Sequence, residues 1–192
     1  MRHAVSVFVC GLMLSAAPFA GMTADEVPQA RIEGSRAVAG GFAAELKEAL
    51  TKELAASGPV GAVDVCKDMA PQIAARAAEK TGWEVGRTSL KPRNPDNAPD
   101  AWEAEVLRAF AERKAAGEDP ARIEAWTVAE AGGETRFRYM KAIPTASLCL
   151  ACHGADIDPE LRAHLDRLYP EDAAVGYREG DIRGAFTISQ PM

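Results

Sequence analysis

Cys149-Leu150-Ala151-Cys152-His153 is the stretch on which the rest of this 192-residue chain depends. Two thiols at this spacing can form thioether bonds to the two vinyl groups of a haem, and the histidine that follows can bind the iron from one face. In an exported chain this motif is typical of haem c attachment. We therefore expect Cys149 and Cys152 to carry one covalent haem c, and His153 to ligate its iron.

Three other uses of the motif fit the sequence less well. A structural zinc site needs four ligands, and beyond the motif only Cys66 and His164 are available once the N-terminal segment is removed. A redox dithiol normally lies between a strand and a helix of a βαβ unit, which residues 141–147 do not resemble. A plain disulfide is the third alternative.

The N-terminus has the pattern of a secretory signal peptide. Arg2 provides a positive start, residues 4–20 are apolar, and polar residues begin at Asp25. We expect a signal peptide over 1–24, cleaved between Ala20 and Asp25, and a single mature domain over 25–192 in the periplasm. An uncleaved membrane anchor is the alternative interpretation. After cleavage no membrane association is expected.

Export makes the cysteine count informative. Cys10 lies in the signal peptide, so the mature chain keeps Cys66, Cys149 and Cys152. If haem uses the last two, Cys66 is an unpaired thiol in an oxidising compartment, which requires a reason.

Composition excludes some classes of function. The net charge of -6 leaves no basic field to hold phosphates, which argues against a nucleic-acid partner. The mature chain has no Ser/His/Asp constellation and no Gly-rich phosphate loop. We therefore do not expect an enzyme, although haem-dependent reduction of a small molecule stays a third possibility.

The periodicity of apolar residues predicts an α+β fold. Gly58-Pro59 separates two helices into a hairpin, and Pro71 should kink the second helix one turn from Cys66. Helices are predicted over 31–57, 60–80, 101–116 and 158–168, a short one at the haem motif, and strands over 83–90, 122–131, 134–143 and 182–189.

Several segments, in this order, resemble a family of c-type haem proteins with a PAS-like fold, long known only as a domain of unknown function. Its members occur as exported cytochromes and as extracytoplasmic sensor domains of kinases and chemoreceptors. The resemblance implies a PAS-like antiparallel sheet with an N-terminal helical hairpin, and iron ligation by His153 and Cys66. The matching segments are Val65-Cys66-Lys67, Ala70-Pro71-Gln72-Ile73-Ala74, 86–95, 149–154, Tyr169-Pro170-Glu171-Asp172, Gly176-Tyr177 and 180–184.

The residues themselves leave the sixth iron position open. Besides an open site, the candidates are Cys66, Met69, Met140 and His164. Cys66 lies on the apolar face of its helix and is the leftover thiol, so with the resemblance it is our first choice.

The haem propionates need cationic partners. Arg87, Arg93 and Arg183 are the candidates, because arginine binds carboxylates through paired hydrogen bonds.

Two functions follow from these expectations. The first is a periplasmic sensor of redox state or of a diatomic gas, acting through ligand exchange at a His/Cys-ligated iron and signalling to a separate protein. The second is a soluble electron-transfer cytochrome c with a redox partner protein.

Overall fold

A four-stranded antiparallel sheet forms the centre of the protein. The computed structural model describes residues 29–131 and 133–192, so the expected signal peptide lies outside the described residues. The strand order is β1-β4-β3-β2, and every neighbouring pair is antiparallel. All four predicted strands are present, which confirms the α+β class. Their bounds are Glu84–Thr88 (β1), Glu124–Ala131 (β2), Glu134–Pro144 (β3) and Ile182–Pro191 (β4).

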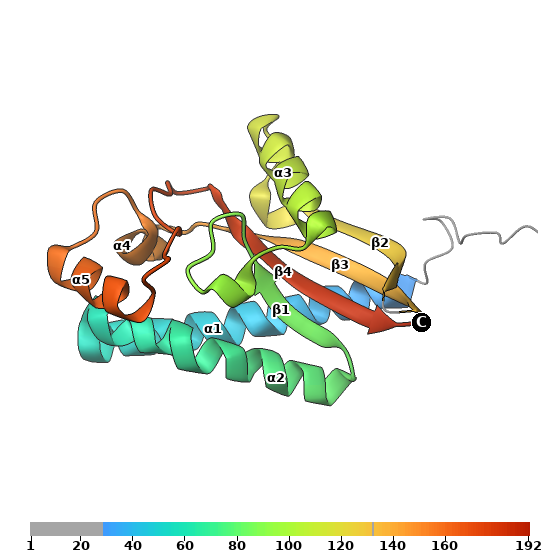
Figure 1. The fold of residues 1–192 in the computed structure, drawn as a ribbon, viewed down its shortest axis with the longest axis horizontal. Coiled ribbons are helices and arrows are strands. Elements are labelled where there is room, and N and C mark those ends of the chain that lie inside the picture. Colours follow the sequence, from blue (N-terminus) through green and yellow to red (C-terminus); the bar gives the residue numbers. More distant parts are fainter. Residues whose placement is uncertain (1–28, 132) are drawn as a thin grey trace, which may run out of the picture.

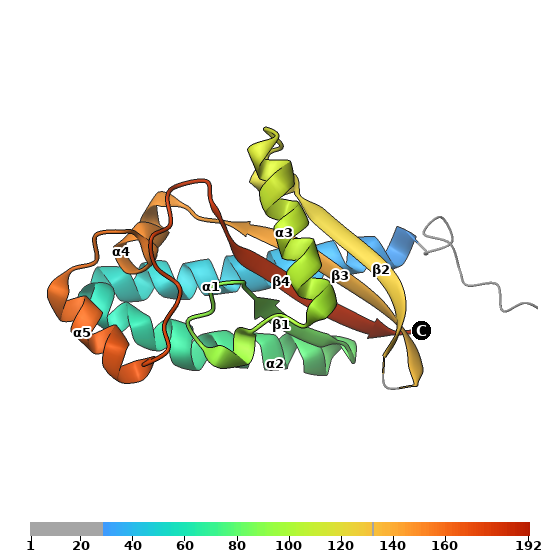
Figure 2. The ribbon, with the colours of Figure 1, turned by 45° about the horizontal axis from the view of Figure 1, so that its top comes forward.

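A helical hairpin packs along one face of the sheet (Figures 1 and 2). Helix α1 spans Gln29–Asp64, with a non-helical residue at Gly58, and α2 spans Ala70–Thr81. Gly58 has φ 68° and ψ -170°, a conformation that is essentially restricted to glycine. The chain therefore reverses at the Gly58-Pro59 break, as the sequence predicts.

A π-helix, η2 (Val65–Met69), lies in the second arm between the end of α1 and the start of α2, and it contains Cys66. Its origin lies in Pro71, which has no N–H to donate to the carbonyl of Lys67. The N–H of Ala70 bonds to the carbonyl of Val65, five residues back. The predicted distortion beside Cys66 is thus a π-bulge, a form of irregularity that often occurs at functional sites.

Helix α3 (Ala101–Ala115) covers part of the opposite face of the sheet (Figure 1). It begins with a capping box, in which the Asp100 carboxylate accepts from the Glu103 N–H at 2.9 Å and the Glu103 carboxylate accepts from the Asp100 N–H at 3.1 Å. The predicted start at Ala101 is confirmed.

The sheet separates two hydrophobic clusters. The hairpin side contains Phe42, Phe137, Tyr139 and Ile188, and the α3 side contains Phe110 and Met140 among others. This follows from the alternation of side chains along a strand, since Tyr139 and Met140 are neighbours that point to opposite faces. The aromatic strand residues therefore form core rather than exposed surface.

Short helices complete the fold, and the last three of them close the end of the molecule beyond the sheet. They are η3 (Pro95–Asn97), η4 (Pro120–Arg122), η5 (Ser147–Cys149), α4 (Leu150–His153) and α5 (Pro159–Leu168). Leu161 and Leu165 of α5 pack on Val63 at the tip of the hairpin. In Figures 1 and 2, α4 and α5 lie together at this tip.

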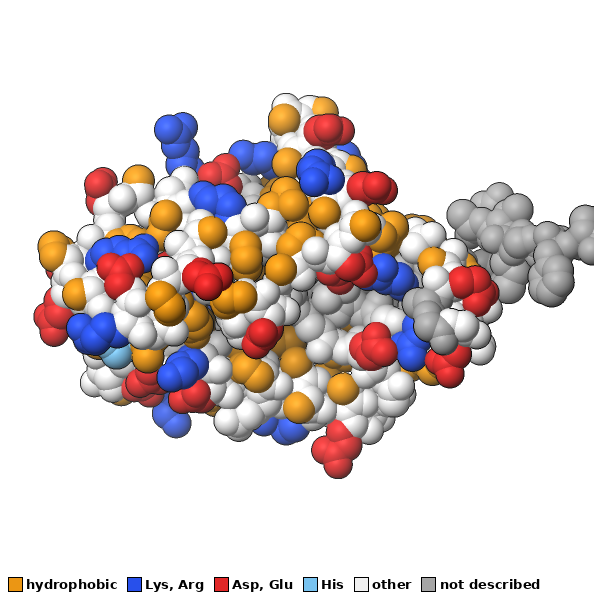
Figure 3. Space-filling view, viewed as in Figure 1, with side chains coloured by type: hydrophobic (Ala, Val, Ile, Leu, Met, Phe, Trp, Pro, Cys, Tyr) orange, Lys and Arg blue, Asp and Glu red, His pale blue; other side chains and the backbone are white. Residues whose placement is uncertain are grey.

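The surface carries both signs of charge. On the face shown in Figure 3, acidic and basic side chains are interspersed. Across 29–131 and 133–192, no helix has the length and apolarity that crossing a membrane requires.

Candidate cofactor site

The seven residues that the sequence favours for the cofactor site line a single cavity. It lies between the tip of the hairpin, the end of β1 with the loop after it, and the segment from η5 to α5. The residues come from four separate regions of the chain and are Cys66, Arg87, Arg93, Cys149, Cys152, His153 and Arg183. The fold therefore brings the candidate attachment thiols, the candidate ligands and the candidate cationic partners together.

The motif forms a short helical segment at the cavity wall. Cys149 ends η5, and α4 carries Cys152 and His153 before Gly154 donates to the carbonyl of Leu150 at 2.8 Å. Both thiols are unpaired, and Cys66 is unpaired as well. Within the described ranges, no three His, Cys, Asp or Glu side chains are arranged to hold a metal ion by themselves.

One ring nitrogen of His153 forms a hydrogen bond with the protein backbone. Its Nδ1 lies 2.8 Å from the carbonyl oxygen of Ala174, and since a carbonyl only accepts, Nδ1 carries the proton. This leaves the Nε2 lone pair available to a metal. Burial, followed by the charges of Arg183 and Arg93, lowers the pKa of His153 to about 2, so the ring is neutral at physiological pH. A neutral imidazole with a fixed tautomer is the form that binds iron.

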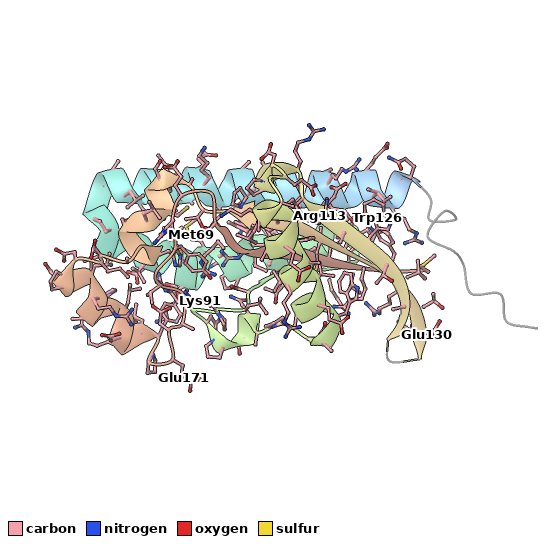
Figure 4. The ribbon with its side chains drawn as sticks, turned by 90° about the horizontal axis from the view of Figure 1, so that it is seen from above. Met69, Lys91, Arg113, Trp126, Glu130 and Glu171 are labelled. Atoms are coloured by element: carbon pink, nitrogen blue, oxygen red, sulfur yellow. The ribbon has the colours of Figure 1, made fainter. Side chains whose placement is uncertain are left out.

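Cys66 is the one of the four candidate sixth ligands that lines the cavity. Met69 is 39% exposed, and Figure 4 shows its place on the hairpin. Met140 is fully buried in the core on the α3 side of the sheet. His164 lies on α5, with Nδ1 3.2 Å from Arg167. The geometry thus favours Cys66 over the alternatives that the sequence left open.

The guanidinium of Arg93 already has an ion-pair partner and hydrogen-bond acceptors within the protein. Its guanidinium lies 3.2 Å from the Asp172 carboxylate and donates to the carbonyls of Cys152 at 2.5 Å and Ala174 at 3.4 Å. Asp172 in turn accepts from the Ala174 N–H at 2.8 Å. Arg93 therefore connects both sides of the loop that orients His153. Its Nε is buried without a partner, and a propionate contact through that atom stays a prediction.

Arg183 and Arg87 make fewer polar contacts with the rest of the protein than Arg93 does. Arg183 donates to the hydroxyl of Ser89 at 3.1 Å and lies over the Tyr177 ring, while its Nε is also buried without a partner. Arg87 lies over the Phe42 ring at 5.6 Å and makes neither a side-chain hydrogen bond nor an ion pair with any described residue. Burial lowers the pKa of both guanidiniums.

The lining of the cavity fits a haem. Its apolar wall includes Leu46, Leu50 and Leu54 of α1 and Ile143 of β3, and among the described residues no Asp or Glu lines it. Three guanidiniums and one buried Asp172 leave an excess of positive charge, which two propionates would neutralise. Buried donors without partners normally indicate a missing acceptor, and the Nε atoms of Arg93 and Arg183 are two such donors.

Close backbone approach shapes one wall of this cavity. A Cβ at Gly184 would lie 2.3 Å from the carbonyl oxygen of Thr88, so any other residue would push β4 away from the end of β1. Because Arg183 and Arg87 lie beside this contact, Gly184 helps to set the spacing of the two guanidiniums.

Sequence reasoning missed the loop over 169–181. Asp172, Ala174 and Tyr177 hold His153 or its neighbours, with the Tyr177 ring edge-on to the imidazole at 6.3 Å. The N–H of Tyr177 also donates to the carbonyl of His153 at 2.9 Å. The segments Tyr169–Asp172 and Gly176-Tyr177 stand out in the sequence, but nothing in their chemistry alone indicates this contact.

Comparison with known proteins identifies the family. The Tll0287-like family model matches residues 20–191. The chain belongs to the Tll0287-like family. A solved structure of the cyanobacterial heme-protein Tll0287 is 31% identical, with a TM-score of 0.54 over 67% of this chain and 72% of that one. No curated protein gives a significant match.

Membership of the Tll0287-like family confirms the resemblance drawn from the sequence. Both the helical hairpin and the four-stranded antiparallel sheet agree with the expected PAS-like α+β fold. The matched range includes every candidate site residue, from Cys66 to Arg183.

Proposed function

We propose that this chain is an exported, periplasmic protein with one haem c, attached through thioethers at Cys149 and Cys152. The observation that carries the proposal is the single cavity lined by these thiols, a neutral imidazole, a third thiol and three guanidiniums, with no carboxylate among the described residues of its lining. Similarity to a structure described as a heme-protein supports the same cofactor.

His153 and Cys66 are the ligands in this proposal. His153 offers Nε2 because Ala174 accepts the proton on Nδ1. Cys66 reaches the cavity from the helical hairpin, which is a different element from the helix that carries His153. Bound haem would supply a redox-active iron, whose ferric form a thiolate ligand stabilises. The midpoint potential should therefore lie below that of a His/Met cytochrome.

Arginines would hold the propionate carboxylates. Arg183 and Arg93 each have a buried Nε without a partner and would bind them directly. Arg87 makes no side-chain hydrogen bond or ion pair with the described residues and would add its positive charge on the Cys66 side. Because Arg93 also holds Cys152 and Ala174 through their carbonyls, it would couple carboxylate binding to the position of the attachment loop.

Sensing through exchange of Cys66 is the function that we infer. Cys66 lies in a π-helix next to a proline, where the regular i to i−4 bonding is interrupted. Such a segment can change its local helical register at lower cost than a regular helix. Cys66 could therefore withdraw when the iron is reduced, leaving a position for a diatomic gas, and a separate signalling protein would respond. Electron transfer predicts instead that both ligands stay in place.

Haem attachment is tested by peroxidase staining after denaturing electrophoresis of the protein purified from an exporting host. We expect a stained band in the wild type and in His164→Ala, and no covalent stain in a Cys149→Ala/Cys152→Ala variant. Haem that acidified organic solvent extracts from the wild type would contradict covalent attachment.

A further inference from the structure

A second hollow lies on the outer side of Cys66. It runs between α2, β1 and the turn at η3, and we name it the outer groove. Four residues line both the outer groove and the cofactor cavity: Cys66, Arg87, Asn94 and Asn97. These four side chains are therefore the partition between the cavity and the outside.

Small side chains keep the outer groove open. Its α2 wall consists of Ala70, Pro71, Ala74, Ala75 and Ala78, which recur on a helical spacing. Ala75 is exposed and Ala74 is half-buried, so the groove extends from solvent toward the core. On the opposite side, β1 contributes Val85, Gly86 and Arg87.

With the two propionates on Arg93 and Arg183, the Arg87 guanidinium would keep the charge at the partition positive. Arg87 has no carboxylate within 4 Å among the described residues and makes no side-chain hydrogen bond to them. The groove contains one acidic residue, Asp96, which is exposed and accepts from Asn94, with an N–O distance of 3.5 Å. A solvated carboxylate at the rim is screened by water, whereas the partly buried guanidinium acts at shorter range and lower dielectric.

We propose that the outer groove is the route by which a small monovalent anion reaches the Cys66 side of the cofactor cavity, and that Arg87 attracts it. The proposal rests on the proposed haem and its Cys66 ligand, and it adds a small anion as a ligand of the ferric state to the diatomic gas proposed for the reduced state. At a ferric iron the exchange would break the bond to the Cys66 sulfur and form a bond to the anion. The released thiolate would take a proton from a water molecule, the hydroxide formed would pass to the buffer, and no electron would move.

Two ligands of similar size but different charge test the route in the ferric holoprotein. Azide is an anion at pH 7 and nitric oxide is neutral, and both are followed by stopped-flow absorbance. Ala75→Trp places an indole in the outer groove and should slow both ligands about tenfold or more. Gln72→Trp is the matched control, because Gln72 is exposed on the same helix and does not line the groove. Its rates should stay within about twofold of the wild type.

The role of Arg87 is tested by comparing how its substitution changes the binding rates of the anionic and the neutral ligand. Electrostatic attraction of this kind changes association rates by about tenfold or more. Arg87→Gln should slow azide by about this factor and leave nitric oxide nearly unchanged, and Arg87→Lys should restore the azide rate. Equal slowing of both ligands by Arg87→Gln would show that Arg87 acts structurally, and equal rates in Ala75→Trp and Gln72→Trp would place the route elsewhere.

A second measurement does not depend on bound haem. Alkylation of Cys66 by anionic iodoacetate and neutral iodoacetamide is followed by mass spectrometry of the Cys66 peptide in the full chain. The thiolate attacks the carbon and iodide leaves. Ala78→Phe and Ala75→Trp should slow both reagents, and Arg87→Gln should slow iodoacetate selectively. If the purified protein lacks a Soret band, the proposed function fails, while the alkylation pattern still decides whether the groove gives access to Cys66.

Discussion

Removing the charge of Asp172 should destabilise the protein more than breaking an exposed ion pair would. The Asp172 side chain is fully buried, and that of Arg93, 3.2 Å away, is 8% exposed. Asp172→Asn keeps the shape and an oxygen for the Ala174 N–H but leaves Arg93 without its counter-charge. Breaking a buried pair in this way costs about 3–5 kcal/mol. Since domains are stable by about 5–15 kcal/mol, the loss is a large fraction of the total.

Urea denaturation followed by tryptophan fluorescence measures this cost. Glu118→Gln is the control, because its partner Arg113 is 39% exposed and such a pair contributes little. A double variant, Arg93→Met with Asp172→Asn, should be more stable than Asp172→Asn alone, since no unpaired guanidinium stays buried. If Asp172→Asn and Glu118→Gln had the same free energy of unfolding, Arg93 and Asp172 would not hold the loop.

Two further predictions concern the scaffold. Gly58→Ala should lower the free energy of unfolding by about 1–3 kcal/mol, because Gly58 has a positive φ. Gly41→Ala, at an exposed position within α1, should raise the free energy of unfolding by about 0.5–1 kcal/mol. Equal effects of the two substitutions in urea titrations would be inconsistent with a break that requires glycine. Burial raises the pKa of Glu124, but hydrogen bonds from Arg36 and Tyr139 outweigh this and place it below the ordinary 4.5. A carboxyl group whose pKa is lowered in the folded state stabilises the fold above pH 4.5, and this contribution is lost as the pH falls through the pKa of the folded state. The difference in free energy of unfolding between wild type and Glu124→Gln should therefore shrink between pH 5 and pH 3. A difference that stays constant would contradict this.

Local patterns predicted most of the elements. The alternation of residues along the four strands acts over a few residues, so the sequence shows it directly. Pro71 likewise indicated a distortion beside Cys66. Whether a kink or a π-bulge forms there depends on how the two helices of the hairpin pack against each other.

Contacts between distant residues could not be predicted in the same way. Arg93 and Ala174 are 81 positions apart, and their contact depends on how the loop after α5 folds back onto the motif. The sequence indicated that Arg93 binds a carboxylate, and the structure shows that Asp172 of the protein occupies part of its guanidinium. The ion pair with Asp172 was not foreseen, and contact between Arg93 and a haem propionate stays a prediction.

The central claim is that Cys66 and His153 ligate the iron of a haem attached at Cys149 and Cys152. Electron paramagnetic resonance and visible spectra of the ferric protein, compared with those of Cys66→Ser, test it most directly. We predict a low-spin signal with thiolate features in the wild type, and loss of these features with a higher midpoint potential in Cys66→Ser, because a hydroxyl is a poor ligand. Identical spectra and potentials in the two proteins would show that Cys66 only lines the cavity, and would contradict both the ligation and the exchange mechanism built on it.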